Sequence, residues 1–557
     1  MNSNQHEVIT HQGGEFELNK AMRERMVAFA NGEILINKNY QNDVDVINKL
    51  AFFECIILDD GSKFIKDEKK QINYVDAYRI LECYDDNQKS VFFDNASMIQ
   101  MEILDLIKLA FAKLATDIHI KLEAPATHIY FRILGELCLH EEWSYDDGNK
   151  FCTTLYESMT TTSGTSFNSR TQQDANINGS YLPDGLSGIR VATGPTQSGN
   201  YFMVLRLLPD GSNSTLDDLG YAKSQITAIR KCLAVNNGGL TLISGPTGSG
   251  KSRTLKAGAE EVIDNAQGRL NFLTIEDPVE YKIQKVRMVK EKKEEFIDGV
   301  SHIKEVERQV IYSASQIAIS STDDVAEKRK LYQKAVIAAM RQDPDFIMIG
   351  EIRDDITADA AITASNTGHP VLTTVHARNA QMIIDRLIKI GADRELLLSP
   401  DMINGMIAQQ LIPILCPNCK QKLSEHLDLI DAELVQRLNE VFAEHGGVDG
   451  IYIRNNNSGE PSCGYYDKDS DLSCIAGYIK REVIAEIILP DVQYLQYMRE
   501  RNLVDANNYW LNELDGYTMM CHGLAKVKRG LVDPHTLESK LKHMTKQENL
   551  DKALCDV

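Results

Sequence analysis

The sequence contains no long hydrophobic run and no excess of positive charge. No apolar stretch approaches the roughly 20 residues that a membrane-spanning helix needs, and residues 1–7 lack the basic and apolar regions of a signal peptide. Acidic residues outnumber basic ones by 80 to 60, for a formal charge of −20. Because proteins bind a nucleic-acid backbone through clustered Lys and Arg, this balance disfavours a nucleic-acid motor, and we expect no nucleic-acid partner.

A disulfide framework is not indicated either. The 11 cysteines are odd in number and scattered along 557 residues, which is typical of reduced thiols and predicts a cytoplasmic protein. With 43% hydrophobic and 25% charged residues, the composition is that of a globular protein rather than a disordered one. The length allows about three or four domains, each with a sizeable core.

One segment carries a complete phosphate-binding signature. It has the spacing G-x-x-x-x-G-K-[ST], an apolar run at 240–243 predicts a strand before it, and an Ala- and Glu-rich segment predicts a helix after it. Glycines let backbone N–H groups surround phosphate oxygens, while Lys251 reaches the β- and γ-phosphates and Ser252 reaches Mg²⁺. The predicted ligands are therefore ATP and Mg²⁺, held by Gly245, Pro246, Thr247, Gly248, Ser249, Gly250, Lys251 and Ser252.

The region around this loop alternates between predicted strands and helices. Strands are predicted over 240–244, 271–275, 346–350 and 371–375. Such alternation is typical of an α/β fold with a mostly parallel sheet covered on both faces. Between the second and third strands, the mixed charges of 285–308 predict a solvated helix or loop.

Three further blocks follow predicted strands, and ligands of α/β sheets bind at such strand ends. Glu276 and Glu280 lie in an acidic block, Glu351 follows an apolar strand, and His376 follows another. Carboxylates there suit the shell of Mg²⁺ or the orientation of a water, and a histidine could hydrogen-bond a γ-phosphate. Each block alone is also compatible with an acidic turn, an exposed strand-end glutamate or a structural histidine.

Taken in order, these blocks resemble the secretion ATPase superfamily, the motors of type II secretion and type IV pilus assembly. Upstream, 115–120 is similar to the family's A-S-D-I-H-I signature, and the similarity extends over roughly 100–490. The resemblance implies a RecA-like P-loop ATPase core preceded by an α+β, PAS-like domain. It also implies that Arg190 and Arg206 approach the nucleotide when the two halves of the protein close. At 409–411 the chain has Gln-Gln-Leu where many members have Gln-Arg-Leu.

A group of cysteines has the form of a metal site. Cys416 and Cys419 make a C-x-x-C knuckle, and Cys463 and Cys474 could supply two more thiolates for a tetrahedral Zn²⁺. The segment 477–486 resembles the ending of the family's zinc module, although Asp471 stands where a further cysteine is usual. Free thiols are the alternative, and we favour zinc.

The predicted domains combine these observations. They are an N-terminal module without a readable motif (1–95), an α+β domain (96–210), a linker (211–225), the ATPase domain (226–490) with its cysteine module (413–478), and a helical tail (491–557).

The resemblance implies a cytoplasmic homohexamer that hydrolyses ATP and drives assembly of a type IV pilus or a type II pseudopilus. An inner-membrane platform protein would be its partner. Glu351 would act on the attacking water, assisted by Glu276 or Glu280, His376 would sense the γ-phosphate, and Arg190 and Arg206 would stabilise the developing charge. The alternatives are an ATPase of a conjugative or effector-delivering type IV secretion system, and a non-catalytic ATP-binding regulatory subunit.

Overall fold

The computed structural model describes most of the chain from residue 95 onward and parts of the chain before it. From 95 it describes all residues except 162–165, 210–213, 235–237, 278, 298–299, 320–324, 456–462 and 468–471. Before 95 it describes residues 10, 16, 18, 20–23, 25–29, 33–40, 43–54, 65 and 72–75. The chain divides into two compact units, 1–210 and 211–557, and each is described by itself.

The first unit begins with a small sheet. Its strands β1, β2 and β3 pair in that order, and Met26, Ile34 and Phe53 are buried in its core. The described elements of this part are α1 (Lys20–Arg23), β1 (Met26–Ala28), β2 (Ile34–Asn37), η1 (Lys38–Tyr40), α2 (Val44–Glu54) and β3 (Ile72–Val75).

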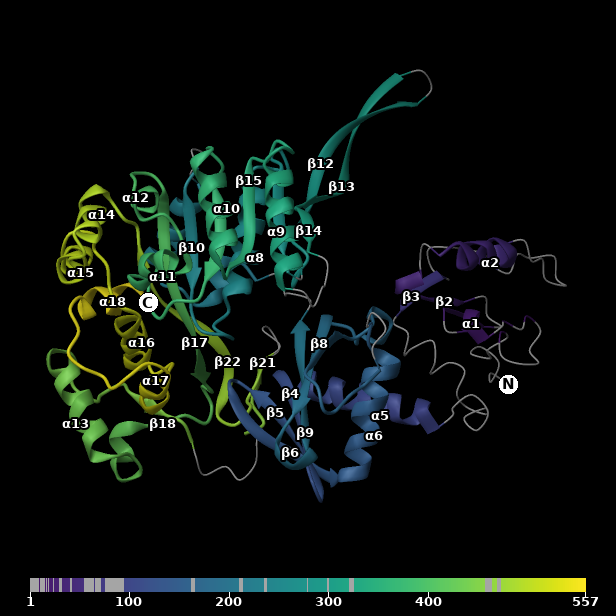
Figure 1. The fold of residues 1–557 in the computed structure, drawn as a ribbon, viewed down its shortest axis with the longest axis horizontal. Coiled ribbons are helices and arrows are strands. Elements are labelled where there is room, and N and C mark those ends of the chain that lie inside the picture. Colours follow the sequence, from purple (N-terminus) through teal and green to yellow (C-terminus); the bar gives the residue numbers. More distant parts are fainter. Residues whose placement is uncertain are drawn as a thin grey trace. The chain divides into compact units, whose positions relative to one another are not determined.

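The rest of the first unit is a six-stranded antiparallel sheet with two helices on one face. Its strand order is β6-β5-β4-β9-β8-β7 (Figure 1). Ile107 and Phe151 of the helices pack with Ile118, Phe131 and Met203 of the strands. The elements are α5 (Asn95–Ala112), β4 (Ala115–Glu123), β5 (Ala126–Ile133), β6 (Glu136–Ser144), α6 (Tyr145–Met159), β7 (Gln173–Asn176), η2 (Gly179–Tyr181), β8 (Leu186–Pro195), η3 (Gln197–Gly199) and β9 (Tyr201–Pro209).

A seven-stranded sheet organises the second unit, with the order β14-β11-β15-β16-β10-β17-β22. All neighbouring strands are parallel except β22, which runs antiparallel to β17. Two separate apolar clusters cover the sheet, so the predicted parallel sheet with two covered faces is confirmed. The strands are β10 (Leu240–Ser244), β11 (Phe272–Glu276), β14 (Ser315–Ala318), β15 (Phe346–Ile352), β16 (Val371–Val375), β17 (Ile403–Leu415) and β22 (Tyr478–Ile488).

Helices of this unit lie on both sides of the sheet, and those of the C-terminal segment pack onto the same core through Trp510, Leu524 and Leu537 (Figure 1). Part of the segment predicted as a linker is also packed, because Leu216 and Tyr221 are buried. The helices are η4 (Leu216–Leu219), α7 (Lys223–Leu233), α8 (Lys251–Asn265), α9 (Val325–Ala339), α10 (Asp355–Asn366), α11 (Met382–Ile390), α12 (Arg394–Leu397), α13 (Ala432–Val441), α14 (Val492–Arg499), α15 (Leu503–Asn512), α16 (Met519–Lys528), α17 (Pro534–Lys540) and α18 (Leu550–Asp556).

Three short helices and four short strands complete the second unit around the cysteine region. β18 pairs with β19, and β20 pairs with β21. These elements are β18 (Gln421–Lys422), η5 (Leu423–Glu425), η6 (Leu427–Leu429), η7 (Ala443–His445), β19 (Tyr452–Ile453), β20 (Tyr466–Asp467) and β21 (Leu472–Ser473).

The prediction of a helix or loop over 285–308 is wrong. This segment belongs to an antiparallel hairpin formed by β12 (Gln284–Ile297) and β13 (Val300–Ser313). The register places opposite charges across the two strands, as for Lys290 and Glu307 at 3.9 Å, and such pairs stabilise a solvated hairpin. Asp-Gly at 298–299 is a sequence signal for a hairpin turn that the charge pattern concealed.

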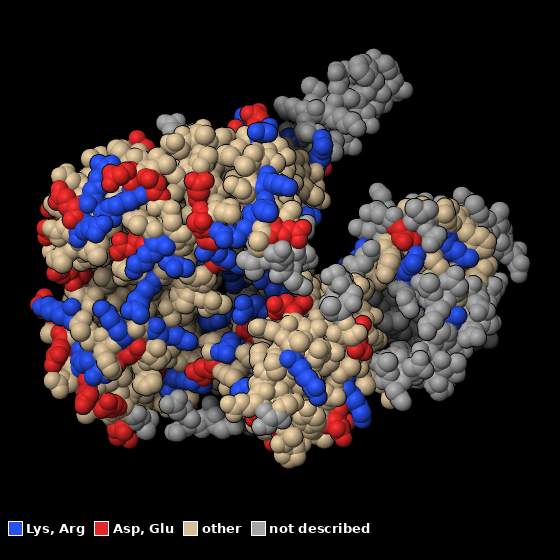
Figure 2. Space-filling model, viewed as in Figure 1, with Lys and Arg blue, Asp and Glu red and all other residues tan. Residues whose placement is uncertain are grey.

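The surface carries charges of both signs. On the face shown in Figure 2, acidic and basic side chains lie interspersed rather than in one continuous basic stripe. Among the described helices, none combines the length and the apolar composition that a membrane span requires.

Candidate functional site

The loop between β10 and α8 has the backbone shape that its glycines permit. Gly245, Gly248 and Gly250 have φ values of +150°, +78° and +86°, in the region that side chains with a Cβ disfavour. A Cβ on Gly245 would also lie 2.3 Å from the carbonyl oxygen of Gln409. The predicted strand, loop and helix are therefore all present, and the loop leads directly into the N-terminus of α8 at Lys251.

Lys251 folds back over this loop. Its Nζ donates to the carbonyl oxygens of Gly245 at 2.8 Å and Pro246 at 3.3 Å. Burial lowers the pKa of Lys251, while the charges of Glu351 and Glu280 oppose that shift. The ammonium group is thus placed among acidic side chains from the ends of two other segments, next to a helix N-terminus that favours anions.

Glu351 occupies the centre of the acidic side of this site. It lies in β15, and the neighbouring strand β16 ends one residue before His376. Oε1 of Glu351 lies 2.8 Å from His376 Nε2, and Oε2 accepts from Arg353 Nε at 2.5 Å. The carboxylate is mostly buried, with 16% of the side chain exposed.

The ring of His376 belongs to the same electrostatic group. Burial lowers the pKa of His376, and the positive charge of Lys251 lowers it further. Glu351 and a hydrogen bond with the Gly245 backbone act in the opposite direction. A neutral imidazole carries a single N–H group, and the Glu351 carboxylate beside Nε2 is placed to accept from it.

The second predicted carboxylate, Glu276, lies in different surroundings at the end of β11. It is buried, and its Oε1 accepts from Thr274 Oγ1 at 2.8 Å and from Gln316 Nε2 at 2.9 Å. Burial raises the pKa of Glu276, although these hydrogen bonds oppose the shift. Glu280 lies within electrostatic reach of both Lys251 and Glu276.

The two predicted arginines lie side by side in the first unit. Arg190 of β8 and Arg206 of β9 are directly opposite each other in the antiparallel register. The same row continues across the next two strands. In the register, Arg206 lies opposite Asp117 of β4, and Asp117 lies opposite Arg132 of β5. Asp117 Oδ1 accepts from Arg206 Nε at 2.9 Å, and Asp117 Oδ2 lies 3.9 Å from Arg132 Nε. The face therefore carries a row of three arginines, two of which lie within 4 Å of the buried Asp117 carboxylate.

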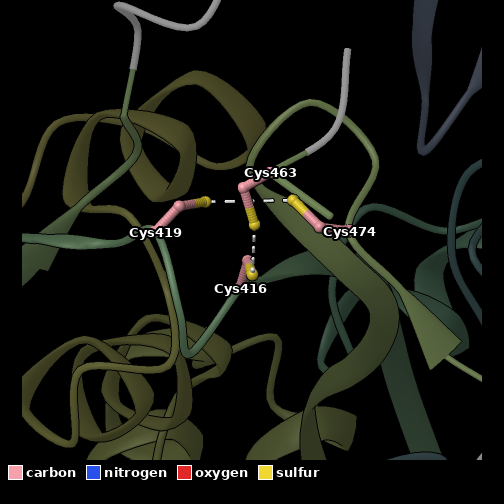
Figure 3. A group of neighbouring side chains, drawn as sticks. All are labelled: Cys416, Cys419, Cys463 and Cys474. Atoms are coloured by element: carbon pink, nitrogen blue, oxygen red, sulfur yellow. Dashed lines mark hydrogen bonds between the residues drawn. The ribbon is translucent and has the colours of Figure 1, made fainter. Parts of the chain in front are cut away.

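The four predicted cysteines form one cluster (Figure 3). Their sulfur atoms all lie within 4.8 Å of one another, with Cys416 and Cys463 at 3.7 Å and Cys419 and Cys474 at 3.8 Å. Four sulfurs each about 2.3 Å from a tetrahedral zinc would lie about 3.8 Å apart. The donor set and its spacing therefore fit Zn²⁺. Asp471, at the family's usual cysteine position, lies outside the described residues.

Several side chains near the phosphate loop or in the arginine row could not be identified from the sequence. Arg353 stands two residues after Glu351 and one residue beyond the end of β15, and strand alternation continued to that position could have placed both side chains on one face. Asp117 lay within a signature already recognised, whereas Gln409 was noted only for its neighbour Gln410. Tyr221 gave no signal, because the segment around it reads as a linker.

The chain was compared with known proteins. Residues 93–544 match the family model described as type II/IV secretion system protein. The chain belongs to this family. The resemblance drawn from the ordered motifs is thereby confirmed.

Individual relatives agree with the family. The chain is 31% identical over 351 residues to a putative type II secretion system protein E of Escherichia coli strain K12, covering 62% of each protein. It is 29% identical over 316 residues to a type IV pilus assembly ATPase, TfpB, of Acinetobacter baylyi, covering 57% of this chain and 47% of that one. The matches thus span between about half and three fifths of these relatives' length.

A solved structure, the ATPase DotB of Legionella pneumophila, aligns with a TM-score of 0.48 at 18% identity, over 81% of this chain and 97% of that one. Likeness of this degree decides nothing about function.

Proposed function

We propose that this protein is an ATP hydrolase that works as a motor for assembly of a type IV pilus or a type II secretion pseudopilus. The observation that carries the proposal is the position of Glu351, between His376 and Arg353 and close to Lys251 of the phosphate loop. A glycine-rich loop, a lysine, a held carboxylate and a neutral imidazole are the parts that hydrolysis of a nucleoside triphosphate needs.

Each part has a chemical task in this proposal. The loop 245–250 and Lys251 bind the β- and γ-phosphates, and the Ser252 hydroxyl binds Mg²⁺. Glu351 orients the attacking water and accepts its proton, while His376, which lies 2.8 Å from Glu351, senses the γ-phosphate. Glu280 adds to the acidic surroundings of the metal, and Glu276 stabilises the acidic block. Mg²⁺ supplies charge neutralisation for the phosphates when it is bound.

Arg190 and Arg206 complete the proposed site as the protein closes around the nucleotide. Guanidinium groups are suited to the charge that develops on a γ-phosphoryl group, and delivery by movement would link hydrolysis to mechanical work. The row of three arginines on one sheet face supports this role, because the strand register sets Arg190, Arg206 and Arg132 on one face together with Asp117. We further propose that the working form is a homohexamer.

Zinc is proposed for the cysteine cluster. Cys416, Cys419, Cys463 and Cys474 would hold it as four thiolates and thereby tie the loop after β17 to the start of β22. Burial raises the pKa of Cys416 and of Cys419, whereas hydrogen bonds from the Tyr465 backbone and Asn418 outweigh burial at Cys463 and lower its pKa to about 7, so the sulfur spacing rather than the pKa values supports zinc. A structural zinc supplies folding stability and takes no part in hydrolysis.

The names of the relatives supply the proposed setting. One relative is a type II secretion protein E and another a type IV pilus assembly ATPase. We place this chain in the cytoplasm, at the inner membrane through a platform protein, and propose no nucleic-acid partner.

The first experiment measures phosphate release from Mg-ATP together with the mass in solution, for wild type and Arg206→Ala. The proposal expects hydrolysis confined to a hexamer and lost in Arg206→Ala. Arg170→Ala, which removes an exposed arginine of the same unit, is the matched control and should behave as wild type. Turnover by a monomer, indifferent to Arg206, would contradict the motor mechanism. ATP binding without any turnover would instead indicate a regulatory subunit.

A further inference from the structure

Gln409 lies beneath the phosphate loop and contacts it directly. It belongs to β17, the strand next to β10, and is fully buried. The Nε2 of Gln409 donates to the carbonyl oxygen of Ser249 at 2.8 Å. The backbone carbonyl oxygen of Gln409 lies so close to Gly245 that a Cβ on that residue would be 2.3 Å from it. One residue therefore supports both ends of the loop.

The bond to Ser249 fixes the direction of a neighbouring N–H group. In a trans peptide unit the C=O and the following N–H point in opposite directions. Holding the Ser249 carbonyl toward Gln409 therefore turns the N–H of Gly250 away from Gln409, toward the concave side of the loop, where phosphate oxygens would accept from it. The left-handed backbone of Gly250, with φ of +86°, permits this orientation.

Tyr221 holds the Gln409 amide in place. The Tyr221 hydroxyl donates to Gln409 Oε1 at 2.6 Å and lies 3.1 Å from Thr254 Oγ1 of α8. Burial raises the pKa of Tyr221, so the hydroxyl keeps its proton and remains a donor. With Oε1 taken by Tyr221, Nε2 is the group left for the Ser249 carbonyl, and the amide has one satisfied orientation.

Tyr221 stands in the segment by which the chain enters the second unit. Its neighbour Gly220 accepts a hydrogen bond from the buried Lys526 Nζ at 2.8 Å, and Lys526 in turn pairs with Glu482 at 2.6 Å. The entry segment, residues 214–222, is thus bonded on one side to the C-terminal helices and is linked on the other, through Gln409, to the phosphate loop.

We propose that Gln409 and Tyr221 are positioning residues for the nucleotide phosphates. Together they fix the Ser249–Gly250 peptide in the orientation that binds phosphate, and they make nucleotide affinity depend on the position of the entry segment. The inference rests on the proposed function, because it takes a nucleoside triphosphate as the ligand of the loop.

The test measures the Kd of Mg-ADP by calorimetry, together with KM and kcat for ATP, in the full chain. The variants are Tyr221→Phe, which removes one hydroxyl, Gln409→Met, which removes both bonds at similar volume, and the double variant. Each single variant should weaken ADP binding about tenfold, the size expected from a lost buried hydrogen bond. The double variant should be no weaker than Gln409→Met, because both residues act through one contact. KM should rise while kcat stays within about twofold.

The matched control is Tyr478→Phe. Tyr478 is also buried and its hydroxyl lies 2.8 Å from Thr536 Oγ1, but the register of β22 sets it opposite Leu415, six residues along β17 from Gln409. Its Kd for Mg-ADP should equal that of wild type. The inference is overturned if both test variants bind as wild type does, or if Tyr478→Phe weakens binding equally. If Gln409→Met does not fold, the test is the Kd of Mg-ADP for Tyr221→Phe compared with that for Tyr478→Phe. A wild-type protein that binds no Mg-ADP would instead refute the proposed function, and this inference with it.

Discussion

Glu276 and Glu351 lie at the carboxyl ends of two neighbouring parallel strands, β11 and β15, yet their surroundings differ. Glu351 is held between a histidine at 2.8 Å and an arginine at 2.5 Å, with Lys251 in electrostatic reach. Glu276 is buried and accepts from two neutral donors, Thr274 and Gln316, on a single oxygen. The chain position of a carboxylate is therefore a poor guide to its task, and the groups around it are a better one.

The difference assigns separate tasks to the two residues. A carboxylate fixed by a cation and a ring, next to a phosphate loop, is placed to act on a water. Glu276 instead ties β11 to β14, because Gln316 belongs to that edge strand. Burial raises the pKa of Glu276, and its hydrogen bonds oppose that shift, so the separation of tasks rests on the neighbouring groups rather than on basicity.

The largest expected effect is that of Glu351→Gln. The amide keeps the volume but cannot accept the proton of the attacking water, so kcat should fall by about 10²- to 10⁴-fold. ATP binding should remain, because the phosphate loop is untouched. Phosphate release measures kcat, and the Kd of Mg-ADP measures nucleotide binding. Turnover at the wild-type rate would remove Glu351 from the mechanism and end the comparison.

Much of this second unit could be predicted from the sequence, for physical reasons that apply to particular residues. The strands predicted at 240–244, 346–350 and 371–375 are mostly apolar and mostly buried in the structure, and glycines at the spacing of Gly245 and Gly250 are typical of a phosphate-binding loop. Cys463 could be grouped with Cys416 because thiolates at such spacings commonly share zinc.

Other features depend on register and tertiary contact, which a sequence does not display. The arginine row arises because Arg190, Arg206 and Asp117 fall opposite one another on three strands. The hairpin of β12 and β13 was concealed by its charges. Gln409 shows no chemical signature of its own, and only the folded neighbourhood of Ser249 indicates its use.

A smaller effect is expected for Arg353, which distinguishes Glu351 from Glu276 by supplying a cation. Arg353→Met removes the charge-assisted bond to Glu351, so kcat should fall by about tenfold. Arg353→Lys keeps the charge without the planar fork and should lie between wild type and Arg353→Met. Arg386→Met, on α11, is the control and should retain wild-type turnover. Equal rates for wild type and Arg353→Met would show that the cation does not organise Glu351.

A still smaller effect on turnover is expected for Glu276→Gln. A glutamine oxygen can accept from both Thr274 and Gln316, since both bonds converge on Oε1. We expect kcat to fall by no more than about threefold, measured beside Glu351→Gln under the same conditions. A loss as large as that of Glu351→Gln would give the two carboxylates one shared task and break the comparison.

The smallest effect is a dependence of stability on pH that belongs to Glu276. Its pKa is raised in the folded protein, so the folded state holds the proton more tightly than the unfolded state does. The stabilisation is complete below the unfolded pKa of about 4.3 and is lost as the pH rises through the folded value. Glutamine does not titrate. The unfolding midpoint of Glu276→Gln minus that of wild type should therefore be higher at pH 8 than at pH 5, by about 1–3 °C.

Thermal unfolding of both proteins at the two pH values gives this double difference, in which any pH-independent cost of the substitution cancels. Glu500→Gln, an exposed glutamate that accepts from Gln496 at 3.0 Å, should show no such difference and serves as the control. A double difference of zero or of opposite sign would mean that burial does not set the protonation of Glu276. The comparison with Glu351 would then rest on the contacts of Glu351 with Arg353 and His376 alone.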